Sequence, residues 1–135
     1  MKIAVVFDTP HGDWGHADFQ QDLESKGEEA EYDVARALVA NGHDVRLIGV
    51  HESLAPLIEQ LAEFQPKLVF NGCEAFRGRA RDEYLIAGII EMHGYRFTGS
   101  SPSALLVARN VCQRVRIGED RLLQLRVGDS VELAA

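Results

Sequence analysis

The stretch that decides the fold is PKLVFNGCEAFRGRARDEYLIAGIIEMHGYRFTGSS, residues 66–101. It begins with a short apolar run at residues 67–70, which Pro66 opens and Asn71-Gly72 closes. A short apolar run between turn residues is typical of a strand that helices cover on both faces. The pattern therefore predicts a central strand of an α/β sheet.

The residues that follow predict a crossover helix and a second strand. Apolar side chains recur at helical spacing over residues 82–93, with acidic residues in the first turn and Gly94 just past the end. Residues 95–98 predict a short strand. The sequence GSSP at 99–102 then starts another helix, with Ser101 at the N-cap and a proline at the first helical position. The unit is therefore βαβα.

The N-terminal half repeats this unit. Strands are predicted over residues 2–7 and 44–50, on either side of a helix over residues 28–41. A further helix is expected from an N-cap at Ser53 to residue 64. The complete order predicts a parallel four-stranded sheet between layers of helices, with right-handed connections.

Two segments depart from this repeat. Residues 8–27 show no sustained period and predict a long loop at the carboxyl end of the first strand. Residues 111–135 predict an atypical tail after a domain at 1–110, because alternating apolar residues and a turn at Gly128-Asp129 favour a β-hairpin. Such a tail fits either a genuine ending or out-of-frame sequence after a truncation.

Composition indicates one soluble domain. The 135 residues suffice for one core and are too few for a second domain of ordinary size. A formal net charge of -7 argues against nucleic-acid binding, which needs a concentrated basic face. No run approaches the roughly 20 apolar residues of a membrane span, and the apolar run at 3–7 is too short for a signal peptide. We therefore expect a cytoplasmic protein, with Cys73 and Cys112 as reduced thiols.

Several short segments give a further signal through their order and spacing. They are Phe70-Asn71, the acidic Glu74, the helix ending in EMHG at 91–94 and the strand ending in TGS at 98–100. Together they resemble the N-terminal domain of D-alanine-D-alanine ligase and its ligase-like relatives, over residues 2–110. The resemblance implies a three-layer Rossmann-like pre-ATP-grasp domain with strand order 2-1-3-4 and helices on both faces.

The resemblance also implies substrate-binding residues. Ligands of open α/β sheets bind beyond the carboxyl ends of the strands. The family register E-x-[DE]-V places Glu31 on the glutamate that holds the amino group of the first D-alanine, a task that suits a carboxylate. A carboxylate that only complements the helix dipole is an equally good interpretation of Glu31.

Three more residues belong to the implied substrate site. Asn71 ends the third strand, and Glu74 follows it where the ligase-like relatives tend to have glutamate. Ser100 lies at a helix N-terminus, where backbone N–H groups can hold an anion. A solvated loop acid is the alternative for Glu74, and N-capping explains the neighbouring Ser101 without a ligand.

Two other clusters of polar residues are better explained as solvent-exposed loops than as binding sites. Residues 8–18 contain the ligand types of zinc, iron or manganese sites, namely Asp8, His11, Asp13, His16 and Asp18. Their spacing matches no known mechanism, so we predict no metal site. Guanidinium groups attract carboxylates and phosphates, but a solvated polar loop explains the cluster Arg77, Arg79 and Arg81.

The function implied by the resemblance is the substrate-side part of an ATP-dependent carboxylate-amine ligase. In a complete enzyme, ATP and Mg²⁺ activate one carboxylate as an acyl phosphate, which the amine of a second amino acid attacks. Residues 1–135 contain no glycine-rich phosphate loop, so we predict no ligase activity and no cofactor for this chain alone. An amino-acid or dipeptide substrate would need an ATP-grasp module in cis or in trans. The alternatives are a non-enzymatic binding module or homodimer and, less favoured, a metal-dependent hydrolase.

Overall fold

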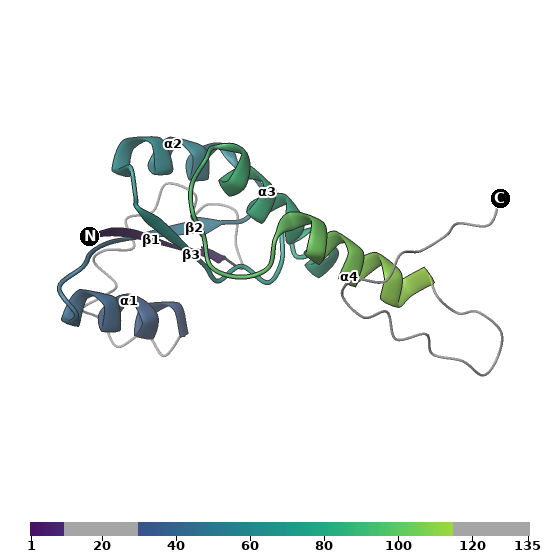
Figure 1. Ribbon diagram of the computed structural model, residues 1–135, viewed down its shortest axis with the longest axis horizontal. Helices are drawn as coiled ribbons and strands as arrows, with labels where there is room; N and C mark the ends of the chain where they lie inside the picture. Colours follow the sequence, from purple (N-terminus) through teal and green to yellow (C-terminus); the bar gives the residue numbers. More distant parts are fainter. Residues whose placement is uncertain (10–29, 115–135) are drawn as a thin grey trace.

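The computed structural model describes residues 1–9 and 30–114, the last six by their backbone only. A parallel sheet lies between helices (Figure 1). Its strands are β1 (Lys2–Asp8), β2 (Asp44–Val50) and β3 (Leu68–Asn71), in the order β2-β1-β3. Both neighbours pair in parallel with β1. The predicted α/β class with a parallel sheet is therefore confirmed.

The helices of the described part of the chain follow the predicted order. They are α1 (Ala30–Ala40), α2 (Ala55–Phe64), the 3-10 turn η3 (Ala80–Asp82), α3 (Tyr84–Met92) and α4 (Pro102–Arg114). The N-cap at Ser101 is confirmed, because its hydroxyl oxygen accepts a hydrogen bond from the Ala104 N–H at 3.2 Å. None of these helices is long and apolar enough to cross a membrane. The predicted loop after Thr9 and the predicted hairpin after Arg114 lie outside the described residues.

The prediction of four strands is wrong. The segment expected as the fourth strand, residues 95–98, makes one parallel bridge, between Val69 of β3 and Phe97. Two backbone hydrogen bonds of 2.8 and 3.0 Å join this segment to Val69. Gly94 (φ 78°) and Gly99 (φ 102°) turn the chain at either end. The extended segment is therefore too short to continue the ladder, although it lies on the β3 side of the sheet.

Strand β1 is central because both of its faces are buried. Residues Ile3 to Phe7 are each at most 3% exposed. Alternate side chains of a strand point to opposite faces. Ala4 and Val6 pack in the larger apolar cluster with α2 and α3, whereas Val5 and Phe7 pack with α1. Helices therefore cover both faces of the sheet, with α1 on one side and α2 and α3 on the other (Figure 1).

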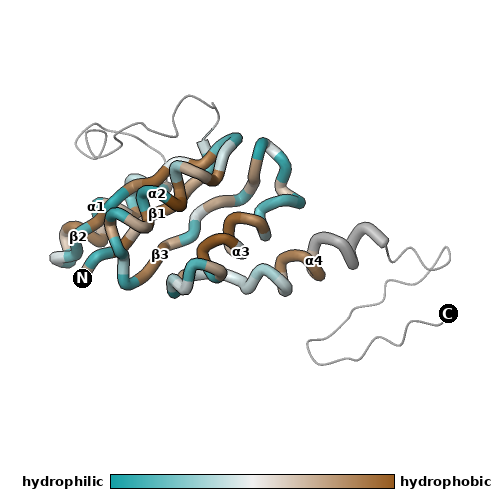
Figure 2. Tube along the Cα trace, turned by 90° about the horizontal axis from the view of Figure 1, so that it is seen from above, coloured by the Kyte–Doolittle hydropathy of each residue, from teal (hydrophilic) through white to brown (hydrophobic). Residues whose placement is uncertain are grey.

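Helix α3 lies between two partners, which explains its hydrophobic sequence. It is apolar along most of its length (Figure 2). Ile86 and Ile90 are fully buried in the cluster above the sheet. Its other side contacts α4, where a Cβ added at Gly88 would lie 3.8 Å from Pro102. A helix with apolar residues on most sides is stable only when it is covered on those sides.

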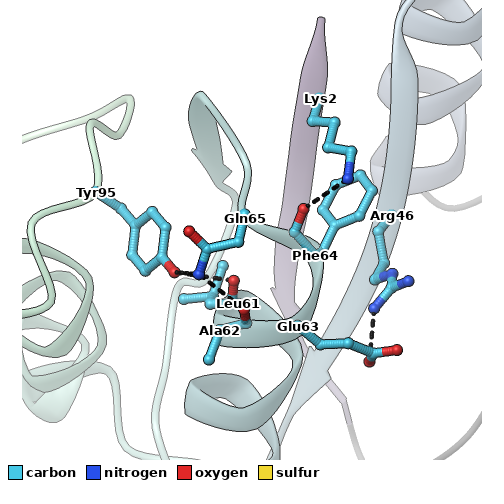
Figure 3. Close-up of polar contacts among 8 residues, drawn as sticks. All are labelled: Lys2, Arg46, Leu61, Ala62, Glu63, Phe64, Gln65 and Tyr95. Atoms are coloured by element: carbon cyan, nitrogen blue, oxygen red, sulfur yellow. Dashed lines mark hydrogen bonds and ion pairs between the residues drawn. The ribbon is translucent and has the colours of Figure 1, made fainter.

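Phe64, at the end of α2, ties this helix to β1 and β2. The Lys2 ammonium lies 5.1 Å from the ring centroid and donates a hydrogen bond to the Phe64 carbonyl at 3.2 Å (Figure 3). The Arg46 guanidinium lies 4.7 Å from the same centroid and pairs with Glu63 at 2.9 Å. Such cation–π contacts stabilise by about 0.5–1 kcal/mol at exposed sites. They fix the end of α2 over the strands.

Tyr95 fixes the segment after α3 to the same helix. Its hydroxyl donates to the Leu61 carbonyl at 2.9 Å and lies 3.4 Å from the Gln65 side-chain nitrogen (Figure 3). Gln65 ends α2 in the left-handed conformation, with φ 53°. The Tyr95 contact holds residues 95–98 beside β3.

Replacing Leu57 by alanine is expected to lower the free energy of unfolding by about 2–5 kcal/mol, because a side chain with 0% exposure leaves a cavity between α2 and the sheet. The urea midpoint at unchanged m value measures this loss. Val107→Ala on α4 is the control, because that side chain is 56% exposed and its removal should change stability by about 0.5 kcal/mol or less. Equal losses for the two variants would contradict this core.

Candidate functional site

The loop after β3 crosses the carboxyl edge of the sheet, where ligands of open parallel sheets bind. It runs from β3 over the end of β1 to the end of β2. Three hydrogen bonds mark this path: Gly72 N to Val6 O at 2.8 Å, Glu74 N to Asp8 Oδ1 at 2.9 Å, and Arg77 N to His51 O at 3.2 Å. Residues from all three strands therefore meet above one edge.

Gly72 and Asn71 shape the start of this loop. A Cβ at Gly72 would lie 3.3 Å from the Val6 carbonyl oxygen, so only glycine lets the loop approach β1 without displacement. The Asn71 side-chain oxygen accepts a hydrogen bond from the Cys73 N–H at 3.3 Å. The Asn71 N–H donates to the Thr98 hydroxyl oxygen at 3.1 Å. Asn71, a predicted substrate-binding residue, thus has a structural role as a turn residue.

Cys73 lies where three elements converge. Burial raises the pKa of the Cys73 thiol well above its ordinary value, and the negative charges of Asp8 and Glu31 raise this pKa further. Asp8 ends β1, and Glu31 lies in the first turn of α1. The structure therefore brings two carboxylates from different elements close to one partly buried thiol.

The other predicted site residues differ in their surroundings. Glu74 is exposed, and its backbone N–H rather than its carboxylate contacts Asp8. Ser100 is exposed in the turn before α4, and no hydrogen bond within the described residues joins it to Glu31, Asn71 or Glu74. The Glu74 backbone thus contacts Asp8, Asp8 and Glu31 both lie near Cys73, and no hydrogen bond among the described residues joins Ser100 to this group.

A pocket of about 230 Å³ opens at the carboxyl ends of β1 and β2. Its walls are Asp8, Thr9, Val50, His51, Arg77 and Gly78. The sequence alone predicts no site role for Val50 or His51. Their position directly at the end of a parallel strand is the signal that could have identified them.

A tight turn brings Arg77 to this pocket. Phe76 and Arg79 exchange backbone hydrogen bonds of 3.2 and 3.0 Å across the turn. Both central residues have positive φ, 53° at Arg77 and 67° at Gly78, as in a type I′ turn. The Arg77 Nε donates to the Glu52 carbonyl at 2.9 Å. The guanidinium carbon lies 5.2 Å from the Phe76 ring centroid.

The three arginines of this loop are exposed, as expected for a solvated loop, but they differ in their partners. Arg79 pairs with Asp82 at 2.6 Å, and Arg81 lies 3.8 Å from the same carboxylate. The described residues hold no ion pair of Arg77, which lines the pocket instead. Within residues 1–9 and 30–114, no group of three or more metal-ligating side chains is present.

His51 is fixed at the rim of the pocket. Its ring Nδ1 donates a hydrogen bond of 2.6 Å to the Thr9 carbonyl, which joins the ends of β1 and β2. The Nε2 atom lies 4.0 Å from a Glu52 carboxylate oxygen. Two fixed polar side chains, His51 and Arg77, therefore line one pocket together with Asp8.

Comparisons with known proteins identify no relative. No family model, no curated protein and no solved structure matches the chain.

In a Cys112→Ser chain, iodoacetamide should modify Cys73 at pH 8 at least about tenfold more slowly in the folded protein than in urea, because a raised pKa lowers the thiolate fraction. Asp8→Asn should speed the reaction of the folded protein, because it removes one of the two negative charges. Asp44→Asn, at the opposite end of the sheet, is the control. Mass spectrometry follows the alkylation. If Cys73 of the Cys112→Ser chain reacts equally fast in the folded protein and in urea, the thiol does not have this buried, negatively charged environment.

Proposed function

We propose that this chain is the substrate-side domain of an ATP-dependent carboxylate-amine ligase similar to D-alanine-D-alanine ligase and its relatives. The sheet order β2-β1-β3 supports this proposal, as does the bridge at Phe97 on the β3 side, where the pre-ATP-grasp order 2-1-3-4 has its fourth strand. Helices on both faces fit the three-layer Rossmann-like arrangement of such a domain.

The observation that supports this function best is the pair of carboxylates around Cys73. Asp8 and Glu31 come from two elements, and the negative charge of each raises the pKa of the Cys73 thiol. Both carboxylates are partly shielded from solvent. Charges in such surroundings interact more strongly than charges in bulk water. An ammonium group supplies the opposite charge and forms charge-assisted hydrogen bonds with carboxylates. We therefore assign the amino group of an amino-acid or dipeptide substrate to this place.

The chain contributes binding and orientation to such a reaction. Holding the ammonium at fixed carboxylates orients the substrate, and orientation lowers the entropic part of the barrier. ATP and Mg²⁺, implied for a full-length relative, would supply the activation of the carboxylate. In this proposal they belong to an ATP-grasp module in cis or in trans, and the chain alone has neither cofactor nor ligase activity.

Glu31→Gln is expected to weaken the binding of D-alanine by about tenfold or more, because hydrogen bonds to charged groups contribute about 1.5–3 kcal/mol. Isothermal titration calorimetry on the full chain measures the dissociation constants. Glu91→Gln is the matched control, because Glu91 is an exposed acid on α3, away from the carboxyl edge. If Glu31→Gln binds D-alanine as tightly as the wild type, or the wild type does not bind it, the proposal is wrong.

A second candidate function is a non-enzymatic association module. Among the side chains that the structure describes on α3 and α4, three large apolar ones are exposed: Met92 at 73%, Leu106 at 40% and Val107 at 56%. Helix α4 extends away from the sheet (Figures 1 and 2). Exposed apolar residues on neighbouring helices are typical of an interface between chains.

If this candidate is correct, the wild type should elute as a homodimer whose dissociation depends on concentration, and Val107→Glu should weaken it by placing a charge in an apolar interface. Light scattering coupled to size-exclusion chromatography measures the mass. Val39→Glu is the matched control, because Val39 is a similarly exposed valine (48%) on α1, away from α3 and α4. If the wild type has the mass of a monomer at every accessible concentration, the chain does not self-associate and this candidate is wrong.

A further inference from the structure

The pocket at the ends of β1 and β2 contains two opposite charges that do not pair with each other. Asp8 and Arg77 both line it. The ion pairs of the described residues do not include one between these two side chains. Separated opposite charges on the walls of one pocket fit a ligand that has both charges itself.

Asp8 links this pocket to the acidic pair of the proposed function. One of its oxygens accepts the Glu74 N–H at 2.9 Å, which fixes the carboxylate. A carboxylate has about four acceptor positions, so this hydrogen bond leaves capacity for an ammonium group. Asp8 is also one of the two charges near Cys73. Asp8 is therefore the residue that this pocket shares with the acidic pair, whereas Glu31 is not among the residues that line the pocket.

Arg77 presents its guanidinium from an unusual backbone position. Its φ of 53° is one that glycine or asparagine adopts at lower cost, so the turn alone does not explain an arginine. The Nε atom is bound to the Glu52 carbonyl, and the described residues provide no hydrogen bond to the terminal nitrogens. Contact with Phe76 further orients the group. Terminal guanidinium nitrogens held in this way suit the bidentate binding of a carboxylate.

The remaining walls limit the size of the ligand. Val50 is 1% exposed and packs in the core, so it closes the pocket from below, and the His51 ring is fixed by its hydrogen bond to Thr9. The volume of about 230 Å³ lies below the roughly 300–1,000 Å³ of pockets for drug-sized molecules. A small amino acid with a short side chain fits this volume.

We propose that Arg77 binds the carboxylate of the amino acid whose ammonium group Asp8 and Glu31 hold. The small volume of the pocket then favours amino acids with a short side chain. This inference rests on the proposed function and adds the group that recognises the other end of the substrate. Arg77 is a binding residue in this account, and no chemical step is assigned to it.

The test compares D-alanine with D-alaninamide, which lacks the negative charge, on the full chain. Arg77→Gly should reduce the affinity for D-alanine by about tenfold or more and change that for D-alaninamide by less than about threefold. Glycine suits the positive φ of this turn, so the variant should melt at the wild-type temperature or above it. Arg81→Ala, an exposed arginine of the same loop outside the pocket, should bind both ligands like the wild type.

The outcomes separate this inference from the proposed function. If Glu31→Gln weakens the binding of both ligands but Arg77→Gly weakens the binding of neither, the ammonium site is supported and the carboxylate site is wrong. If Arg77→Gly weakens both ligands equally, Arg77 acts through the shape of the loop, and the inference is also wrong. If the wild type binds neither ligand, both proposals fail. Selective loss of D-alanine affinity in Arg77→Gly supports the inference.

Discussion

The burial of β1 on both faces is the constraint on which the rest of the structure depends. A strand with no exposed face needs a layer of helices on each side and a strand on each edge. Because β2 and β3 both pair in parallel with β1, all three strands end at the same edge. The two apolar clusters on either side of β1 then determine where α1, α2 and α3 lie.

Asp8 connects this core to the candidate site. It is the last residue of β1, and it is therefore as well fixed as the strand itself. Its carboxylate holds the loop after β3 through the Glu74 N–H, acts on the Cys73 thiol and lines the pocket. A side chain that holds a loop in place and faces a pocket gives that loop a defined geometry before any ligand arrives. Preorganised charges of this kind bind a ligand without the cost of ordering them first.

Much of the fold could be predicted from local patterns. The apolar runs identified all three strands, and the Ser101-Pro102 pair identified the start of α4. The pattern failed at residues 95–98, because strand propensity does not show how many partners the segment can reach. It also failed at the start of α2, where Leu54 rather than Ser53 occupies the N-cap, although the Ser53 hydroxyl accepts the Ala55 N–H at 3.2 Å.

The candidate site was less predictable, because it depends on the path of one loop. The family register predicts Glu31 as a site residue, and the sequence places Asp8 at the carboxyl end of the first strand, but nothing in the sequence indicates that both charges act on Cys73. The positive φ of Arg77 and the 3.3 Å approach at Gly72 are properties of the tertiary structure, and no sequence spacing indicates them. The residue type of Asn71 is compatible with its role in the turn. Its hydrogen bond to Thr98 could not be predicted, because the two residues are far apart in the sequence and meet only in the folded chain.

The central claim is that the carboxyl edge of the sheet is the ligand-binding face. An NMR titration of the ¹⁵N-labelled chain with D-alanine tests it most directly, because each backbone N–H reports its own surroundings. The account predicts saturable shifts at the amides of Thr9, His51 and Glu74, with those of Lys67 and Gln65 at the opposite edge unchanged. Shifts confined to Lys67 and Gln65, or none at any concentration, would contradict it.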